Sequence, residues 1–171
     1  MGKYVLSILV KNSSGVLSRV CGLFSRRGYN IDSLTVGRTE DPLVSRMTIT
    51  LKGDEDILEQ VKKQLNKLQE VITVINFTPD NSVYRELVLI KVRANCEDRA
   101  AINETVKIFR CKIIDLSSDT LTIELTGDES KVSALIKLME EYGIEELVRT
   151  GVTALQRGDS TIKSSLENDE L

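Results

Sequence analysis

One short pattern occurs once in each half of this chain. Leu51-Lys52-Gly53-Asp54-Glu55 is echoed by Leu125-Thr126-Gly127-Asp128-Glu129, and in both places alternating apolar residues give way to apolar residues at helical spacing. Alternation is typical of a strand, and a period near 3.6 is typical of a helix, so each run marks a strand-to-helix junction. Because the flanking elements also recur in the same order, the chain is predicted to repeat one structural unit.

The order of predicted elements sets the fold class. The first half is expected to hold strands over 4–10, 31–38, 43–51 and 71–77, one helix that follows Gly15 and a second that Asp54 caps. The second half repeats this order with strands over 86–93, 111–116, 121–125 and 144–155, and with helices over 98–109 and 129–142. Two βαββαβ units predict an α+β fold of two ferredoxin-like domains in tandem. We place the domains at 1–78 and 85–159, a linker at 79–84, and a polar tail at 160–171 that is expected to fray.

Composition excludes several functional classes. The net charge of -3 and the absence of a basic block argue against nucleic acid as a partner, and no apolar run is long enough to span a membrane. No signal peptide precedes the first strand, so we expect a cytoplasmic protein. The chain has no histidine and only three cysteines, Cys21, Cys96 and Cys111, without a CxxC pair. We therefore predict no catalytic residues and no metal site.

The loop before the first helix is the candidate binding site. Asn12, Ser13 and Ser14 lie at the N-terminal end of this helix, where backbone N–H groups lack partners and the helix dipole favours a carboxylate or phosphate. Gly15 allows a ligand to approach the backbone, and Gly28 is expected to end the helix in the left-handed conformation. The simpler interpretation is that Asn and Ser only cap the helix and that the glycine only relieves a turn.

The second half does not repeat this loop. Its counterpart over 94–99 has no glycine and carries two acidic residues, Glu97 and Asp98, which would repel a carboxylate. We infer one ligand-binding domain and one domain that docks or dimerises. Aliphatic residues on both faces of the strands also predict that a second copy of the domain covers the open face of the sheet, so a homodimer is expected.

Three runs of the first half, together with several of the second, resemble one family. The runs cover residues 12–20, 22–36 with its Gly28-Tyr29-Asn30-Ile31 sequence, and 45–49; in the second half they include Glu104-Thr105, 108–110, 113–115 and the closing Arg157-Gly158-Asp159. This pattern is similar to the small regulatory subunit of acetohydroxyacid synthase (acetolactate synthase), over nearly the whole chain apart from the acidic tail.

The resemblance implies an N-terminal ACT domain and a non-catalytic protein. Such a subunit binds the thiamine-diphosphate-dependent catalytic subunit, raises its activity and makes it sensitive to valine or another branched-chain amino acid. Thiamine diphosphate, magnesium and FAD are then expected on the catalytic subunit and not on this chain. The implied effector site lies at the interface of an ACT dimer and consists of Asn12, Gly15, Val16, Leu17, Asn30 and Ile31.

The physical properties of these residues agree with that assignment. The effector carboxylate would meet the N–H groups around Gly15 to Leu17, the two asparagines could accept from its ammonium, and its side chain would rest on Val16, Leu17 and Ile31. Arg19, Arg46 and the run 157–159 can be read either as docking residues or as ordinary surface and turn residues.

Three rival functions share this fold. RNA-recognition modules stack bases on aromatic residues of the central strands, where this chain has Leu6, Ile8 and Met47. An acylphosphatase-like hydrolase would need a convergent catalytic group that cannot be assembled here. The serious alternative is a stand-alone ACT-domain sensor of an amino acid that regulates a different enzyme.

Overall fold

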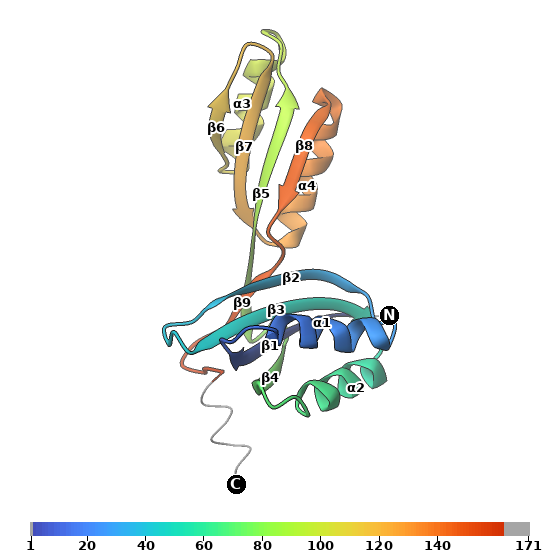
Figure 1. Cartoon of the computed structure of the whole chain (residues 1–171). Coiled ribbons are helices and arrows are strands. Elements are labelled where there is room, and N and C mark those ends of the chain that lie inside the picture. Colours follow the sequence, from blue (N-terminus) through green and yellow to red (C-terminus); the bar gives the residue numbers. More distant parts are fainter. Residues whose placement is uncertain (1, 163–171) are drawn as a thin grey trace. The chain divides into compact units, whose positions relative to one another are not determined.

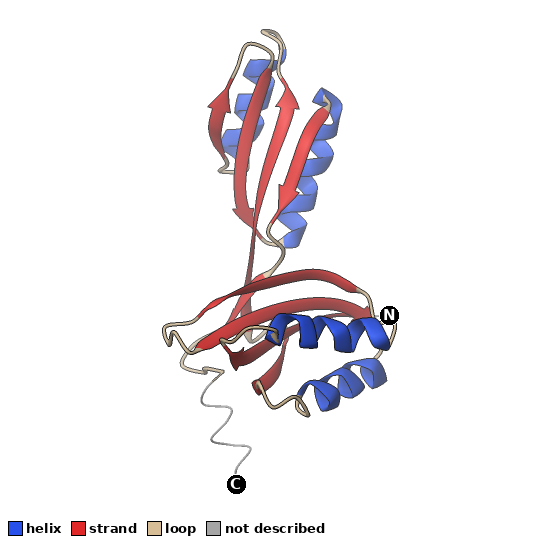
Figure 2. Cartoon of the chain, viewed as in Figure 1, coloured by secondary structure: helices blue, strands red, loops and turns tan. Residues whose placement is uncertain are grey.

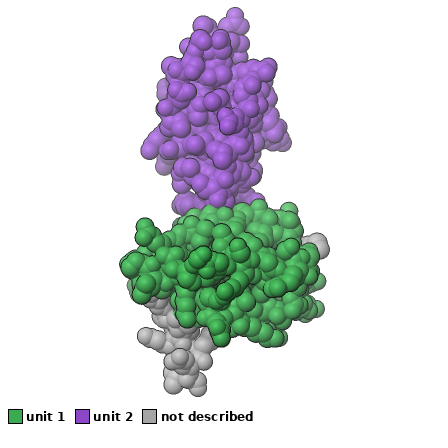
Figure 3. Space-filling model, viewed as in Figure 1, with its two compact units in different colours: residues 1–83, 152–171 green, residues 84–151 purple. Residues whose placement is uncertain are grey.

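The computed structural model of the chain describes residues 2–162 (Figure 1). These residues form two compact units (Figure 3). Unit 1 combines the chain up to Val83 with the segment from Val152 onwards, and unit 2 spans Tyr84–Gly151. Within the described residues, no helix has the length and apolar character needed to cross a membrane.

Unit 1 is a four-stranded antiparallel sheet with two helices on one face (Figure 2). The sheet order is β2-β3-β1-β4, and the elements are β1 (Gly2–Lys11), α1 (Val16–Arg26), β2 (Ile31–Arg38), β3 (Val44–Gly53), α2 (Glu55–Leu65) and β4 (Val71–Phe77). Every second residue of β1 and β3 faces the helices, and these residues form the core with the helical stripes: Leu6, Ile8, Val10, Met47, Ile49, Leu51, Val20, Phe24, Val61 and Leu65.

The helix boundaries in unit 1 follow local chemistry. Asp54 has extended backbone, and its carboxylate accepts a hydrogen bond from the Ile57 N–H at 2.9 Å, as the sequence predicts for a cap of α2. Gly28 has φ +69 just after α1, where the Tyr29 N–H donates to the Phe24 carbonyl at 3.0 Å. The left-handed helix end predicted at Gly28 is confirmed.

Unit 2 repeats the same arrangement. Its elements are β5 (Ser82–Arg93), α3 (Asp98–Ile108), β6 (Lys112–Leu116), β7 (Thr120–Gly127), α4 (Glu129–Met139), a 3₁₀ turn (Glu140–Tyr142) and β8 (Ile144–Arg149). The sheet order β6-β7-β5-β8 matches that of unit 1 position by position. Asp128 caps α4 by accepting from the Lys131 N–H at 2.9 Å, as Asp54 caps α2. The predicted α+β fold with two ferredoxin-like βαββαβ sheets is confirmed.

The contacts in the structure divide the chain differently from the predicted second domain at 85–159. The expected extended run over 144–155 breaks at Gly151, which has φ +83, and continues as a separate strand, β9 (Thr153–Gln156). β9 pairs with β5, and the Arg157 N–H donates to the Asn81 carbonyl at 2.7 Å. β5 begins at Ser82, in unit 1, and continues into unit 2 from Tyr84, so the segment 79–84 is no plain linker. By their contacts, residues from Val152 onwards belong to unit 1.

The structure describes the first three residues of the predicted tail. Ile162 among them is only 3% exposed, so its side chain packs against other residues of the chain. The rest of the predicted tail, 163–171, lies outside the described residues.

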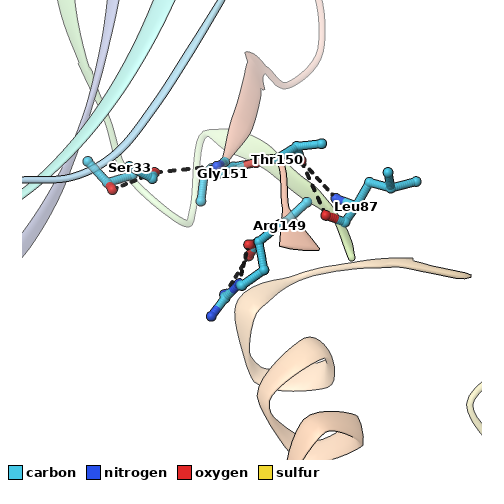
Figure 4. A network of polar contacts seen from close by, with 8 residues as sticks. Ser33, Leu87, Arg149, Thr150 and Gly151 are labelled. Atoms are coloured by element: carbon cyan, nitrogen blue, oxygen red, sulfur yellow. Dashed lines mark hydrogen bonds and ion pairs between the residues drawn. The ribbon is translucent and has the colours of Figure 1, made fainter. Parts of the chain in front are cut away.

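The second face of the unit 1 sheet is rich in hydroxyl groups and is buried. Ser7, Thr48 and Thr50 on this face are at most 2% exposed. The segment from Val152 lies here: the Val152 N–H donates to Ser33 Oγ at 3.5 Å, and Thr35 Oγ1 donates to the Val152 carbonyl at 3.0 Å (Figure 4). The chain's own C-terminal segment thus covers part of a face that we expected a second copy to cover, so an open sheet face gives no argument for dimerisation.

Candidate functional site

The loop between β1 and α1 leads into a helix without a side-chain cap, although the Val16 N–H donates to the Ser13 carbonyl at 3.5 Å. Gly15 is the N-cap of α1 with φ +84, and no side chain caps this helix. The simpler interpretation thus fails in one part, because none of Asn12, Ser13 and Ser14 caps the helix, and holds in the other, because φ +84 at Gly15 is a turn that glycine relieves. A Cβ atom added at Gly15 would meet nothing within 4 Å, so the space beside the first turn is open. These features suit a small anion at the helix N-terminus.

Asn12 ties this loop to the turn between β2 and β3. Its backbone N–H donates to the Leu43 carbonyl at 2.7 Å, and its Nδ2 donates to the Pro42 carbonyl at 2.9 Å. With Nδ2 engaged, the side-chain oxygen is the group that can accept from a ligand. Asn12 is thereby oriented as a hydrogen-bond acceptor.

Asn30 is oriented in the same way at the other end of α1. Its Nδ2 donates to Asp32 Oδ1 at 3.0 Å, which again leaves the amide oxygen as the acceptor. Asp32 itself lies 3.7 Å from the Lys52 ammonium. Sequence reasoning missed Asp32, although its position two residues after Asn30 on a strand, where alternate residues share a face, was a usable signal.

The structure does not bring the two asparagines together within one chain. They flank α1, whose 11 residues span about 16 Å. The sheet register agrees: Ile31 aligns with Leu51 and, through β3, with Tyr4, whereas Lys11 aligns with Val44 at the opposite end. From Tyr4 to Lys11, the two ends of the sheet are seven residue-to-residue steps apart along β1, or about 24 Å. The predicted residues therefore lie in two separate groups, which are called half-sites below: one over Asn12–Leu17 and one at Asn30–Ile31.

The three predicted apolar residues differ in what they can contact. Val16 is 3% exposed and belongs to the core, so only its backbone can reach a ligand. Leu17 is 40% exposed, and Ile31 is half-buried against the core. Val36 and Leu43, which sequence reasoning missed, are 50% and 75% exposed at the end of the sheet that carries Asn12.

The loop of unit 2 that corresponds to Asn12–Gly15 has its donors occupied. Asn95 Oδ1 accepts hydrogen bonds from the backbone N–H groups of Glu97 and Asp98, both at 2.9 Å. A side chain therefore fills the position that no side chain fills in unit 1. This difference agrees with the inference that only the first domain binds a small anion.

Three basic residues could be either docking residues or ordinary surface residues, and two of them, Arg19 and Arg157, have partners within unit 1. Arg19 forms an ion pair with Glu70, and Arg157 Nε donates to the Ser82 carbonyl at 3.0 Å. Arg46 is half-buried, and burial lowers the pKa of its guanidinium below the ordinary value. Arg157 and Gly158, which has φ +65, thus serve as a turn that fastens the end of β9. Among residues 2–162, no group of three or more Cys, Asp and Glu side chains is placed to hold a metal ion.

Comparisons with known proteins agree with this two-unit architecture. Residues 85–158 match a family described as the small subunit of acetolactate synthase, and residues 6–73 match the AHAS small subunit-like ACT domain. A probable acetolactate synthase small subunit from Archaeoglobus fulgidus is 56% identical over 92% of this chain and 98% of the relative. The chain belongs to the acetolactate synthase small subunit family. The small subunit from Mycobacterium leprae is 52% identical over 91% of this chain and 92% of its own length.

The fold of this family member is also that of a solved relative. The crystal structure of the acetolactate synthase small subunit from Thermotoga maritima matches with a TM-score of 0.87 and 46% identity, over 94% of this chain and all of the other. The expected family resemblance and the ACT-type fold of unit 1 are confirmed.

Proposed function

We propose that this chain is a non-catalytic regulatory subunit that acts in the cytoplasm on the thiamine-diphosphate-dependent catalytic subunit of acetohydroxyacid synthase. It raises the activity of that subunit and makes it sensitive to feedback inhibition by valine or another branched-chain amino acid. The observation that carries the proposal is the match along nearly the whole chain to relatives named as small subunits.

The two half-sites support a site that two copies of the chain build together. β2 is an edge strand of unit 1, and a two-fold axis can pair it only antiparallel with β2 of a second copy. Antiparallel pairing brings the Ile31 end of one strand to the Arg38 end of the other. Because Asn12 is bonded to the turn that follows Arg38, its half-site would meet the Asn30 half-site of the partner.

The proposed effector is an amino acid with an aliphatic side chain. Its carboxylate accepts from the N–H groups at the start of α1, next to Gly15. Its ammonium donates to the amide oxygens of Asn12 and Asn30, and its side chain packs on Leu17 and Ile31. Each group of the ligand then has a partner of matching polarity.

A site shared by two copies offers a physical route to regulation. A ligand that bridges the half-sites binds only the arrangement in which they face each other, so it stabilises that arrangement by its differential affinity. The catalytic subunit would sense the effector through the arrangement of the two ACT domains.

The testing experiment measures acetolactate formation by the cognate catalytic subunit, with and without this protein, during titration with valine, leucine and isoleucine. Activation by the protein together with inhibition by one of the amino acids supports the proposal and names the effector. No activation and no amino-acid response would refute it in favour of a stand-alone ACT sensor for another enzyme.

A further inference from the structure

Strand β6 is an exposed edge of the unit 2 sheet. All 5 of its residues are exposed, and Figure 1 shows the strand at the border of that sheet. Three of them are aliphatic: Ile113 is 38%, Ile114 49% and Leu116 60% exposed. Ile108, at the end of the preceding helix α3, is 77% exposed. An edge strand with unpaired backbone groups and exposed aliphatic side chains is suited to pairing with another strand.

An irregularity in β6 places its two charged residues on one face. Lys112 and Ile113 align with Glu124 and Ile123, whereas Asp115 and Leu116 align with Thr122 and Leu121, so Ile114 is an extra residue in the ladder. Ile123 and Leu121 face the helices, and Glu124 and Thr122 face the other way. Lys112 and Asp115 therefore share the face opposite the helices although they are three positions apart, which a regular strand would not allow.

We propose that β6 pairs antiparallel with β6 of a second copy of this chain, with Lys112 opposite Asp115 and Ile113 opposite Ile114. Two-fold symmetry produces each pair twice. Lys112 of either copy then meets an opposite charge on the same face, and the exposed aliphatic residues of both copies are covered. The strand is complementary in charge to itself, and this argues for a second copy and against an unrelated partner.

The repeat within the chain also supports a second copy of this chain as the partner of β6. β6 holds the edge position in unit 2 that β2 holds in unit 1. The contact is separate from the proposed effector site, because none of its residues belongs to either half-site. A small subunit would thus have one self-pairing edge in each unit.

The test is chemical cross-linking of the full-length protein. Unlabelled chain is mixed with ¹⁵N-labelled chain, allowed to exchange, and treated with a carbodiimide, which joins an amine to a carboxylate in contact. After digestion, mass spectrometry should find Lys112 joined to Asp115 in peptides with one labelled and one unlabelled half. Lys112 and Glu124 of one chain, 3.9 Å apart, give an internal control for the reagent.

Charge complementation makes the test specific for the register. Asp115→Lys places two amines at each contact and Lys112→Glu places two carboxylates there, so neither variant alone can form the amine-to-carboxylate product and like charges also face each other. Mixing the two variants restores opposite charges at both positions and should restore the product. Leu138→Asp, on the exposed side of α4 in the same unit, is the matched control and should change nothing.

Two results would overturn the proposal. If Lys112 and Asp115 are never joined between chains while the Lys112–Glu124 product forms, the bulged and charged edge protects β6 from pairing. If single variants lose the product but their mixture does not regain it, although circular dichroism shows both folded, another register or another surface joins the chains. Neither result bears on the effector site, which the valine titration tests.

Discussion

A site divided between two chains behaves differently from a site within one chain when mutants are mixed. Asn12→Ala and Asn30→Ala each remove one acceptor for the effector ammonium. A hydrogen bond to a charged group contributes about 1.5–3 kcal/mol, so each variant should bind valine roughly 10- to 150-fold more weakly. The control variant is Asn103→Ala, which alters an exposed residue of helix α3 in unit 2 and should bind valine as tightly as the unaltered protein.

The mixture of the two variants gives a quantitative expectation. In a mixed dimer, one site has both substitutions and the other has neither, because each site takes Asn12 from one chain and Asn30 from the other. Random exchange makes half of the dimers mixed, so about a quarter of all sites should regain full affinity. Isothermal titration calorimetry measures this as a tight-binding stoichiometry near one quarter of that of the unaltered protein.

The structure explains why the opposite result would be decisive. Within one chain the half-sites are about 24 Å apart, estimated from the seven residue-to-residue steps along β1 from Tyr4 to Lys11. A valine molecule spans only about 6 Å. If mixing restores no tight sites although both variants are folded and exchange chains, the two half-sites do not form one site, and the reasoning from β2 pairing is refuted.

Four further predictions follow from single residues. Gly15→Asp should reduce valine inhibition of acetolactate formation more than Gly15→Asn. Both new residues tolerate φ +84, but only Asp adds a charge, which repels a carboxylate about 4 Å away by about 1–4 kcal/mol. Equal effects of the two substitutions would show that backbone strain alone is responsible. Arg149→Met should lower the free energy of unfolding in urea by about 2 kcal/mol, because Arg149 donates to both carboxylate oxygens of Glu86, which is 4% exposed. Arg93→Met removes an exposed ion pair with Glu145 and should lower the free energy of unfolding by less than about 1 kcal/mol. Burial raises the pKa of the Cys111 thiol, so an aromatic disulfide reagent at pH 8 should modify exposed Cys96 first, and similar rates would contradict this burial. Hydrogen bonds from the Lys131 N–H and the Ser130 hydroxyl lower the pKa of the Asp128 carboxyl below its ordinary 3.8. The free energy of unfolding that Asp128→Ala removes, about 1 kcal/mol, should therefore be constant between pH 5 and pH 7 and become smaller as the pH falls below about 4.

Local patterns in the sequence predicted the local structure of this chain well. The strand over 31–38 and the strand over 71–77 begin and end where alternation of apolar residues predicts. Asp54 and Asp128 each cap a helix by accepting a hydrogen bond from the backbone N–H three residues later. Such a cap involves only residues that are close in the sequence, so the sequence pattern indicates it. The repeated junction in the sequence thus corresponds to the same hydrogen bond in both units.

The end of the chain could not be predicted from the same patterns. Leu147, Val148 and Leu155 make the run 144–155 look like one strand, because apolar spacing does not report which sheet a segment joins. Its break depends on Gly151. Its destination depends on two hydrogen bonds more than 110 positions back along the chain: the Val152 N–H donates to Ser33 Oγ, and Thr35 Oγ1 donates to the Val152 carbonyl. Contacts at such separations have no periodic signature.

The separation of the half-sites was hidden for a related reason. Asn12 and Asn30 lie on either side of one helix, and proximity along the chain suggests a single loop cluster. The length of α1 and the register of β1 through β3 are what move them to opposite ends of the sheet. The residues of the predicted site come from the sequence, whereas the proposed division of the site between two chains rests on the geometry.

β2 connects these observations. It begins with the half-site at Ile31, it is the edge proposed to pair with a second copy, and its Ser33 and Thr35 side chains hold the backbone of Val152 (Figure 4). Val152 directly follows Gly151, the last residue of unit 2, whose neighbour Thr150 is bonded to the β5 backbone at Leu87. A ligand that changes the position of β2 therefore acts on the residue at which the chain enters unit 1. The chain returns to unit 1 at Val152, so the hydrogen bonds of Ser33 and Thr35 hold the first residue of the returning segment on the edge strand.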